Sequence, residues 1–161
     1  MKHLLKHPVH LFSLGFGAGL VPFAPGTMGS LVGVIFYIFL QSLALSWLSY
    51  LAIIAILFVP GVWFCGMTAR ALGVHDHPAI VWDEIVGFLV TMVAVPAGWG
   101  WVLSGFMLFR FFDIVKPWPI GFIDAHVGGG FGIMLDDLLA GVYGLAVLHV
   151  AAFAFSEILV W

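Results

Sequence analysis

Long apolar runs, separated by short segments rich in Gly, Pro and charge, constrain this chain more than any other feature. Two runs begin at Ser30 and Trp47 and each extends for about 17–20 residues, the length that a helix needs to cross a bilayer core of ~30 Å. The run Ala79–Phe112 is too long for one helix and is broken at Pro96–Gly98, and a last run begins at Leu138. This pattern predicts an all-α membrane bundle with about five transmembrane helices.

Composition supports the membrane class and a single domain. Of the 161 residues, 63% are hydrophobic and 8% are charged, whereas soluble domains carry about 25% charged residues. A soluble fold of this length cannot bury so much apolar surface. We therefore treat residues 1–161 as one integral-membrane domain. A bundle of four transmembrane helices is the alternative, with Ala79–Phe112 as a re-entrant or strongly tilted hairpin.

Charge and cysteine usage disfavour a nucleic-acid-binding protein and a fold held together by disulfides. The net charge is −3 and no basic run is present, so a nucleic-acid partner is not expected. Cys65 is the single cysteine, and it cannot form an internal disulfide.

The charged residues also indicate an orientation. With a cytoplasmic N-terminus, all five Lys and Arg lie on the cytoplasmic face, in agreement with the positive-inside rule. Only Glu157 falls on the other face. The charges that share the cytoplasmic face are Lys2, Lys6, Arg70, Asp76, Asp83, Glu84, Arg110, Asp113, Lys116, Asp124, Asp136 and Asp137. We therefore expect the chemistry of the protein on that face.

Two pairs of adjacent carboxylates stand where apolar helices are expected to begin: Asp83-Glu84 and Asp136-Asp137. Ionised carboxylates at membrane depth are costly, and four of them repel one another unless a cation lies between them. Mg²⁺ prefers oxygen ligands and is commonly held by carboxylates together with substrate phosphate. Gly87 and Gly141, one turn after each pair, would let the helices approach closely. We therefore predict a magnesium site. The alternative is that the acids only favour the helix macrodipole.

Arg110 and Lys116 bracket Asp113 at a spacing of three residues, and Pro117 is expected to end their helix. Arg offers a planar fork and Lys a point charge, and both suit a phosphate group. The alternative is that the two cations snorkel to the membrane boundary, with Asp113 as their counter-ion.

The segment Leu14–Ser30 is rich in Gly and Pro and is predicted to be a loop. Free N–H groups near a helix start at about Ser30 could receive an anion, which makes Thr27 a candidate phosphate ligand. Alternatively, the four-residue spacings of glycine in this segment only tighten helix packing.

A compact polar trio, His75, Asp76 and His77, precedes Pro78. Structural zinc takes four N or S ligands, so zinc is disfavoured in a chain with one Cys. A protonated histidine suits a phosphate oxygen or a leaving alkoxide. We therefore take His75 as a candidate phosphate ligand, and Asp76 and His77 as candidate catalytic residues. A solvated interfacial turn is the alternative.

Four stretches, in this order along the chain, together resemble the bacterial phosphatidylglycerophosphatase A family. The resemblance implies a multi-pass enzyme of the bacterial inner membrane, which hydrolyses the terminal phosphomonoester of phosphatidylglycerophosphate to phosphatidylglycerol and uses Mg²⁺. The stretches are LGFGAGLVPFAPGTMGS (Leu14–Ser30), GVHDHPAIVWDEIVG (Gly73–Gly87), FRFFDIVKPWPI (Phe109–Ile120) and GGGFGIMLDDLLAG (Gly128–Gly141).

Roles for the individual residues follow as physical hypotheses. The four paired acids would hold one or two Mg²⁺ ions. Arg110 and Lys116, helped by Thr27 and His75, would bind phosphate oxygens. Asp113 is the candidate base or nucleophile, because it stands between the cations; attack by water and an aspartyl-phosphate route are both open.

Three other functions are compatible with a membrane chain of this kind. A phosphatase for another lipid phosphate is the nearest alternative. A small transporter also uses buried carboxylates, but it predicts charges near mid-membrane and on both faces. A non-catalytic subunit of a membrane complex would need no clustered acids.

Overall fold

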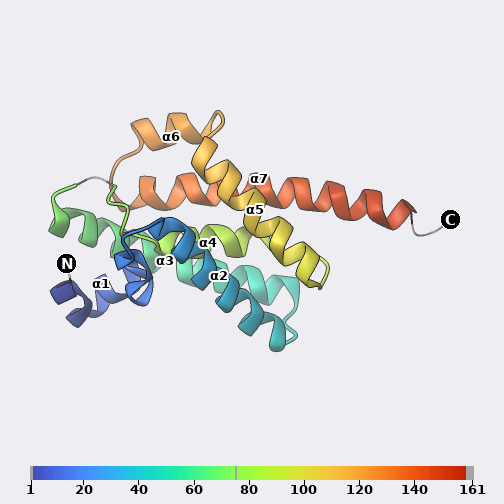
Figure 1. Ribbon diagram of the computed structural model, residues 1–161, viewed down its shortest axis with the longest axis horizontal. Coiled ribbons are helices and arrows are strands. Elements are labelled where there is room, and N and C mark those ends of the chain that lie inside the picture. Colours follow the sequence, from blue (N-terminus) through green and yellow to red (C-terminus); the bar gives the residue numbers. More distant parts are fainter. Residues whose placement is uncertain (1, 75, 159–161) are drawn as a thin grey trace.

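A computed structural model of the chain describes residues 2–74 and 76–158, and every regular element in these ranges is a helix (Figure 1). The longest helix, α7 (Gly129–Ile158), runs along the long axis of the molecule. The N- and C-terminal ends lie toward opposite ends of that axis. The predicted all-α class is confirmed.

Three short elements precede the first long helix: the 3₁₀ helix η1 (Lys2–Lys6), α1 (Pro8–Ser13) and η2 (Gly15–Leu20). Pro8 is at the first helical position of α1, where its missing N–H costs nothing. The chain then turns within η2, where Phe16 and Gly17 have φ of 58° and 99°. The turn brings Ser13 next to Val81, whose N–H donates to the Ser13 carbonyl.

The first two long helices, α2 (Pro25–Ser42) and α3 (Trp47–Leu72), follow each other through a short connection. Ser46 caps α3, because its hydroxyl accepts a hydrogen bond from the N–H of Ser49. Gly73 ends α3 with φ of 70°, a left-handed conformation that glycine adopts without a steric penalty.

The helix pair predicted for Ala79–Phe112 is present as α4 (Trp82–Thr91) and α5 (Trp99–Val115). The break between them covers residues 92–98, which include the predicted Pro96–Gly98, although α4 already ends at Thr91. Nine of the ten residues of α4 are buried, because α2, α3, α5 and α7 all pack around it. The hydroxyl of Tyr50 donates to the Leu89 carbonyl at 3.0 Å and joins the start of α3 to the end of α4.

Glycine allows α4 and α7 to approach closely. A Cβ at Gly87 would lie 2.7 Å from the carbonyl oxygen of Asp137, and one at Gly141 would overlap the carbonyl oxygen of Gly87. The expected role of these two glycines is therefore confirmed, and their helices hold the acids on facing elements.

Among the described residues, three helices are long and apolar enough to cross a membrane: α2, α3 and the part of α7 over Gly129–Phe155. Their lengths and composition are those of a membrane protein. Helix α5 has 17 residues and α4 has 10. At 1.5 Å per residue, α4 covers only about 15 Å, about half of a bilayer core.

Two helix starts differ from the prediction. Helix α2 begins at Pro25 rather than near Ser30, because proline presets the helical φ, so Leu14–Ser30 is only partly a loop. Helix α7 begins at Gly129 rather than near Leu138. A Cβ at Gly130 would overlap the carbonyl oxygen of Val62, so close packing against α3 accompanies this glycine-rich first turn. The short helix α6 (Ile120–His126) precedes it.

Candidate metal and phosphate site

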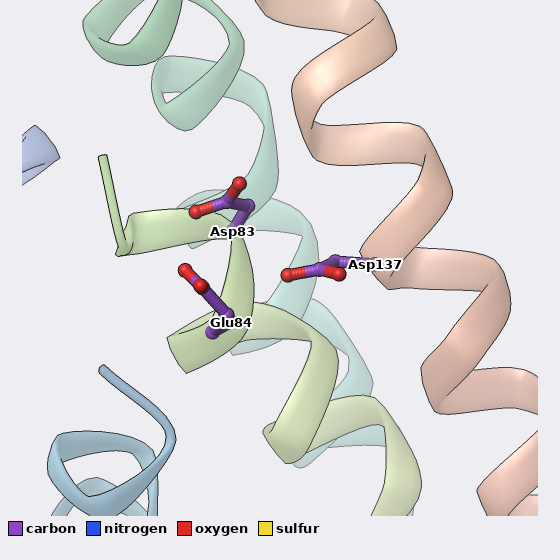
Figure 2. A group of neighbouring side chains, drawn as sticks. All are labelled: Asp83, Glu84 and Asp137. Atoms are coloured by element: carbon purple, nitrogen blue, oxygen red, sulfur yellow. The ribbon is translucent and has the colours of Figure 1, made fainter. Parts of the chain in front are cut away.

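Three of the four predicted metal ligands come together between α4 and α7. Asp83, Glu84 and Asp137 each offer one carboxylate oxygen, and these oxygens all lie within 4.8 Å of one another. Asp83 and Glu84 belong to the first turn of α4. Asp137 points toward them from α7 (Figure 2). We call these three residues the acid triad.

Burial makes the acid triad suited to a cation. Asp83 is 7% exposed and Asp137 is 3% exposed. Within the described part of the chain, Asp83 Oδ1 and Glu84 Oε2 are buried without a hydrogen-bond partner. Buried carboxylates without compensation are strongly unfavourable. Converging carboxylate oxygens are the donor set of a hard divalent cation, so the residues fit a metal such as Mg²⁺.

Arg110 lies at the edge of the acid triad. Its Nη1 is 4.0 Å from Glu84 Oε1 and forms a close ion pair with Asp113, one turn further along α5. The same nitrogen is 3.5 Å from the hydroxyl of Ser30. The Asp113 carboxyl also interacts with that of Asp137. The predicted grouping of Arg110 and Asp113 beside the acids is therefore present.

The first turn of α2 covers this edge. A Cβ at Gly26 would overlap Glu84 Oε1 and would lie 3.1 Å from Arg110 Nη1, so a larger residue there would displace both side chains. Thr27 follows it and is half-buried. The first N–H groups of a helix have no intrahelical acceptor and attract anions. This turn and the guanidinium of Arg110 therefore lie together at the edge of the acid triad, and both offer N–H donors.

Lys116 lies apart from the edge at which it was expected. Its Nζ donates to Asp136 Oδ2 at 2.7 Å and is 2.8 Å from Asp124 Oδ1. Burial lowers the pKa of this amine, but the hydrogen bonds and charges of the two carboxylates outweigh it, and the net pKa shift is upward. The amine is therefore protonated at neutral pH.

Asp136 is outside the acid triad for a geometric reason. Adjacent residues of a helix point about 100° apart, and of this pair Asp137 points toward the acids of α4 whereas Asp136 points toward Lys116. Asp136 faces Lys116, while its Oδ1 is buried without a hydrogen-bond partner in the described ranges. The fourth predicted ligand therefore lies beside the triad and is ion-paired.

The polar trio before α4 is only partly described. His75 lies outside the described residues. Asp76 is exposed, and its charge acts on both Asp83 and Asp136. His77 Nδ1 accepts a hydrogen bond from the N–H of Ala79 at 3.1 Å, so this histidine shapes the turn that leads into α4.

Sequence reasoning missed three residues of this region: Gly26, Ser30 and Asp124. Gly26 and Ser30 were included only as parts of a loop, and the one-turn spacing Gly26–Ser30 is meaningful only once α2 is known to begin at Pro25. The Ser30 hydroxyl donates to the Gly26 carbonyl at 2.9 Å. Asp124 reaches Lys116 through the fold of α6, and no sequence spacing indicates that contact.

Comparison with known proteins identifies close relatives. The chain is 48% identical over 148 residues to Phosphatidylglycerophosphatase A of Haemophilus influenzae, covering 91% of this chain and 90% of the relative. It is 44% identical over 146 residues to the protein of that name in Escherichia coli, covering 90% and 84%. It is also 40% identical over 148 residues to a candidate phosphatidylinositol-3-phosphatase of Bacteroides thetaiotaomicron, covering 88% and 91%.

No solved structure matches the chain. A family model described as Phosphatidylglycerophosphatase A matches residues 11–152, a range that contains the acid triad, Arg110, Asp113 and Lys116. The family model and the identities over about nine-tenths of the chain agree. The chain belongs to the phosphatidylglycerophosphatase A family.

Proposed function

We propose that this protein hydrolyses the terminal phosphomonoester of phosphatidylglycerophosphate, releasing phosphatidylglycerol and phosphate in glycerophospholipid synthesis. Two relatives at 48% and 44% identity are phosphatidylglycerophosphatases by name, and they support this substrate. The structural observation that carries the proposal is the acid triad, in which three buried carboxylates converge within 4.8 Å beside Arg110. Such a set suits phosphoryl transfer, which depends mainly on charge neutralisation and positioning.

The acid triad is the proposed holder of Mg²⁺. Asp83, Glu84 and Asp137 supply its oxygens, and the neighbouring Asp136 stays paired with Lys116. A bound divalent cation would supply charge neutralisation for the phosphoryl group and a more acidic attacking water. The orphaned oxygens of Asp83 and Glu84 support this role, because such atoms need a partner when they are buried.

Arg110 and the first turn of α2 would bind the phosphoryl oxygens that lie away from the acid triad. The guanidinium offers several donors in one plane, and its Nε is buried without a partner among the described residues. Backbone N–H groups near Thr27 would add further hydrogen-bond donors, which the helix already holds in place before the substrate binds. Together they would hold the phosphomonoester against the acids in one orientation.

Asp113 is the proposed base or nucleophile. Its ion pair with Arg110 fixes the carboxyl at the edge of the triad. As a base it would accept a proton from the attacking water. As a nucleophile it would form an aspartyl-phosphate that water then hydrolyses. His77 and Asp76, at the turn into α4, are the proposed source of the proton for the leaving alkoxide.

The proposed location is the bacterial inner membrane, with the site on its cytoplasmic face. A lipid substrate would keep its acyl chains in the bilayer while its phosphate reaches the start of α4. Helices α2, α3, α5 and α7, with the buried α4 between them, would form the five predicted membrane segments. The half-length α4 tolerates this position because its neighbours, rather than lipid, surround it.

A second substrate class is favoured by one relative, the candidate phosphatidylinositol-3-phosphatase at 40% identity. The experiment that tests both is phosphate release by the purified full-length chain in detergent. Phosphatidylglycerophosphate, phosphatidylinositol 3-phosphate and phosphatidate would be supplied in parallel, with added Mg²⁺ or with EDTA. We expect the first to be hydrolysed with the highest kcat/KM. A higher kcat/KM for either of the others would contradict the proposed substrate.

A further inference from the structure

One cation near the site is left without a role by the proposed chemistry. Lys116 does not contact the acid triad, and its Nζ instead joins Asp136 of α7 to Asp124 of α6. The two carboxylates differ in their surroundings. The side chain of Asp136 is 7% exposed, whereas that of Asp124 is 40% exposed. The Asp136 contact is therefore part of the interior, and the Asp124 contact faces the surroundings.

The Asp124 contact is the one that an incoming anion can replace. Exposed ion pairs contribute little stability, so separating Lys116 from Asp124 costs little. Separating Lys116 from the buried Asp136 would leave an uncompensated charge in the interior and is strongly unfavourable. An ammonium group also has three N–H donors, and the two carboxylates account for two of them in the described structure.

The position of Lys116 relative to Arg110 indicates which part of a bound substrate Lys116 could reach. The two residues are six positions apart in the sequence: Arg110 lies near the end of α5, and Lys116 is the C-terminal cap of that helix. Their carboxylate partners adjoin each other, because Asp113 interacts with Asp137 while Lys116 pairs with Asp136. Lys116 therefore lies beside the acid triad, at the residue that precedes Asp137.

The geometry points to Lys116 as the binding residue for a second phosphate, the phosphodiester of the lipid substrate, whose place Asp124 occupies in the free protein. This inference rests on the proposed function. Phosphatidylglycerophosphate carries a terminal phosphomonoester and, across one glycerol unit, a phosphodiester that joins it to diacylglycerol. With the monoester at Arg110 and the acid triad, the diester lies toward Lys116. The diester has a single negative charge, so it replaces the Asp124 carboxylate without changing the charge around Lys116.

This arrangement distinguishes lipid phosphates by their chemistry. A lipid with both a phosphodiester and a phosphomonoester engages both cations, whereas phosphatidate has a single phosphate and engages only Arg110. Lys116 therefore contributes to substrate affinity through a group that does not react, so its loss raises KM rather than lowering kcat.

The test is steady-state phosphate release from phosphatidylglycerophosphate by the full-length protein in detergent. Lys116→Gln is expected to raise KM about tenfold with kcat within about twofold of wild type. Asp124→Asn is expected to lower KM by about two- to fivefold, because it removes the competing carboxylate. Lys6→Gln, which removes an exposed lysine of η1, is the matched control and is expected to leave both constants unchanged.

Inhibition by product fragments gives an independent measurement. Phosphatidylglycerol, which retains only the diester, is expected to inhibit Lys116→Gln more weakly than wild type. Inorganic phosphate, which resembles only the monoester, is expected to inhibit both equally. Thermal unfolding in detergent checks that each variant is folded, and Asp124→Asn carries the test alone if Lys116→Gln is not.

A KM for Asp124→Asn at or above the wild-type value would overturn the inference, since a purely structural Lys116–Asp124 ion pair predicts that result. A loss of kcat in a folded Lys116→Gln variant without a change in KM would overturn it too. If the wild-type protein releases no phosphate from this lipid, the proposed function fails instead, and the two failures are thereby distinguished.

Discussion

Glu84 of α4 and Arg110 of α5 meet at the edge of the acid triad, with 4.0 Å between Oε1 and Nη1. The backbone of Gly26, at the start of α2, lies directly against both side chains. Three helices thus converge where an acidic metal site and a cationic phosphate site adjoin. Substitutions at these contacts, and at the glycines that allow the helices to pack closely, should therefore change activity or stability.

Asp137→Asn should abolish phosphate release, with a loss of at least about a hundredfold in kcat. The substitution removes one of three converging negative charges while it preserves the shape of the side chain. It should not unfold the protein, because it relieves carboxylate repulsion. Phosphate release and thermal unfolding of the purified variant would be measured together. Near-normal turnover in a folded Asp137→Asn variant would remove the basis for the metal assignment.

Gly26→Ala should lower kcat/KM by about tenfold or more. The added Cβ would overlap Glu84 Oε1 and lie 3.1 Å from Arg110 Nη1, so both groups must move from the positions they hold around a phosphate. Gly100→Ala is the matched control, because a Cβ there meets nothing within 4 Å. Equal activities of the two variants would show that the first turn of α2 does not shape the site.

Gly141→Ala should destabilise the protein by about 1–3 kcal/mol, the usual cost of overpacking. Its Cβ would overlap the Gly87 carbonyl oxygen and lie 3.0 Å from the Cβ of Val90. The separation of α4 and α7 would increase, and the acid triad would widen with it. Thermal unfolding in detergent, compared with Gly100→Ala, measures the effect. An unfolding temperature equal to that of the control would contradict the close packing.

Tyr50→Phe should affect stability but not catalysis. It removes the hydroxyl that donates to the Leu89 carbonyl at 3.0 Å, and one such bond contributes about 1 kcal/mol. Tyr50 lies in the first turn of α3 and contacts the end of α4 that is opposite its acidic first turn. The unfolding temperature should therefore fall while kcat/KM stays within about twofold. A large fall in kcat/KM would contradict this prediction, because it would mean that a change at the Leu89 end of α4 displaces the acids at its first turn.

The sequence predicts the helical class, and Pro96–Gly98 correctly mark the connection between α4 and α5, because proline and glycine interrupt helices by local geometry. The end of α4 at Thr91, five residues before Pro96, has no such local signal. The start of α7 could not be predicted, since the stretch Gly128–Gly132 is typical of a loop when its packing is unknown. Gly130 lies in a helix because α3 approaches its backbone, and such a tertiary contact has no local signature.

The candidate site shows the same division between local and tertiary information. The acids were identified from their unusual position in apolar sequence, and three of them converge. Asp136 is adjacent to Asp137 and is therefore predicted as a fourth ligand, but Lys116 holds its carboxylate, a tertiary contact that the sequence does not show. Lys116 was grouped with Arg110 by spacing, but it lies at the C-terminal cap of α5 with φ of 45°. The helix ends before it, so helical spacing no longer sets its direction.

The most direct measurement is phosphate release from phosphatidylglycerophosphate by the purified wild-type chain, first after EDTA treatment and then with increasing Mg²⁺. The account predicts no release after EDTA, a return of activity as Mg²⁺ is added, and no return in Asp137→Asn at the concentration that saturates wild type. Activity that is unaffected by EDTA, or equal recovery in wild type and Asp137→Asn, would contradict a cation held by Asp83, Glu84 and Asp137.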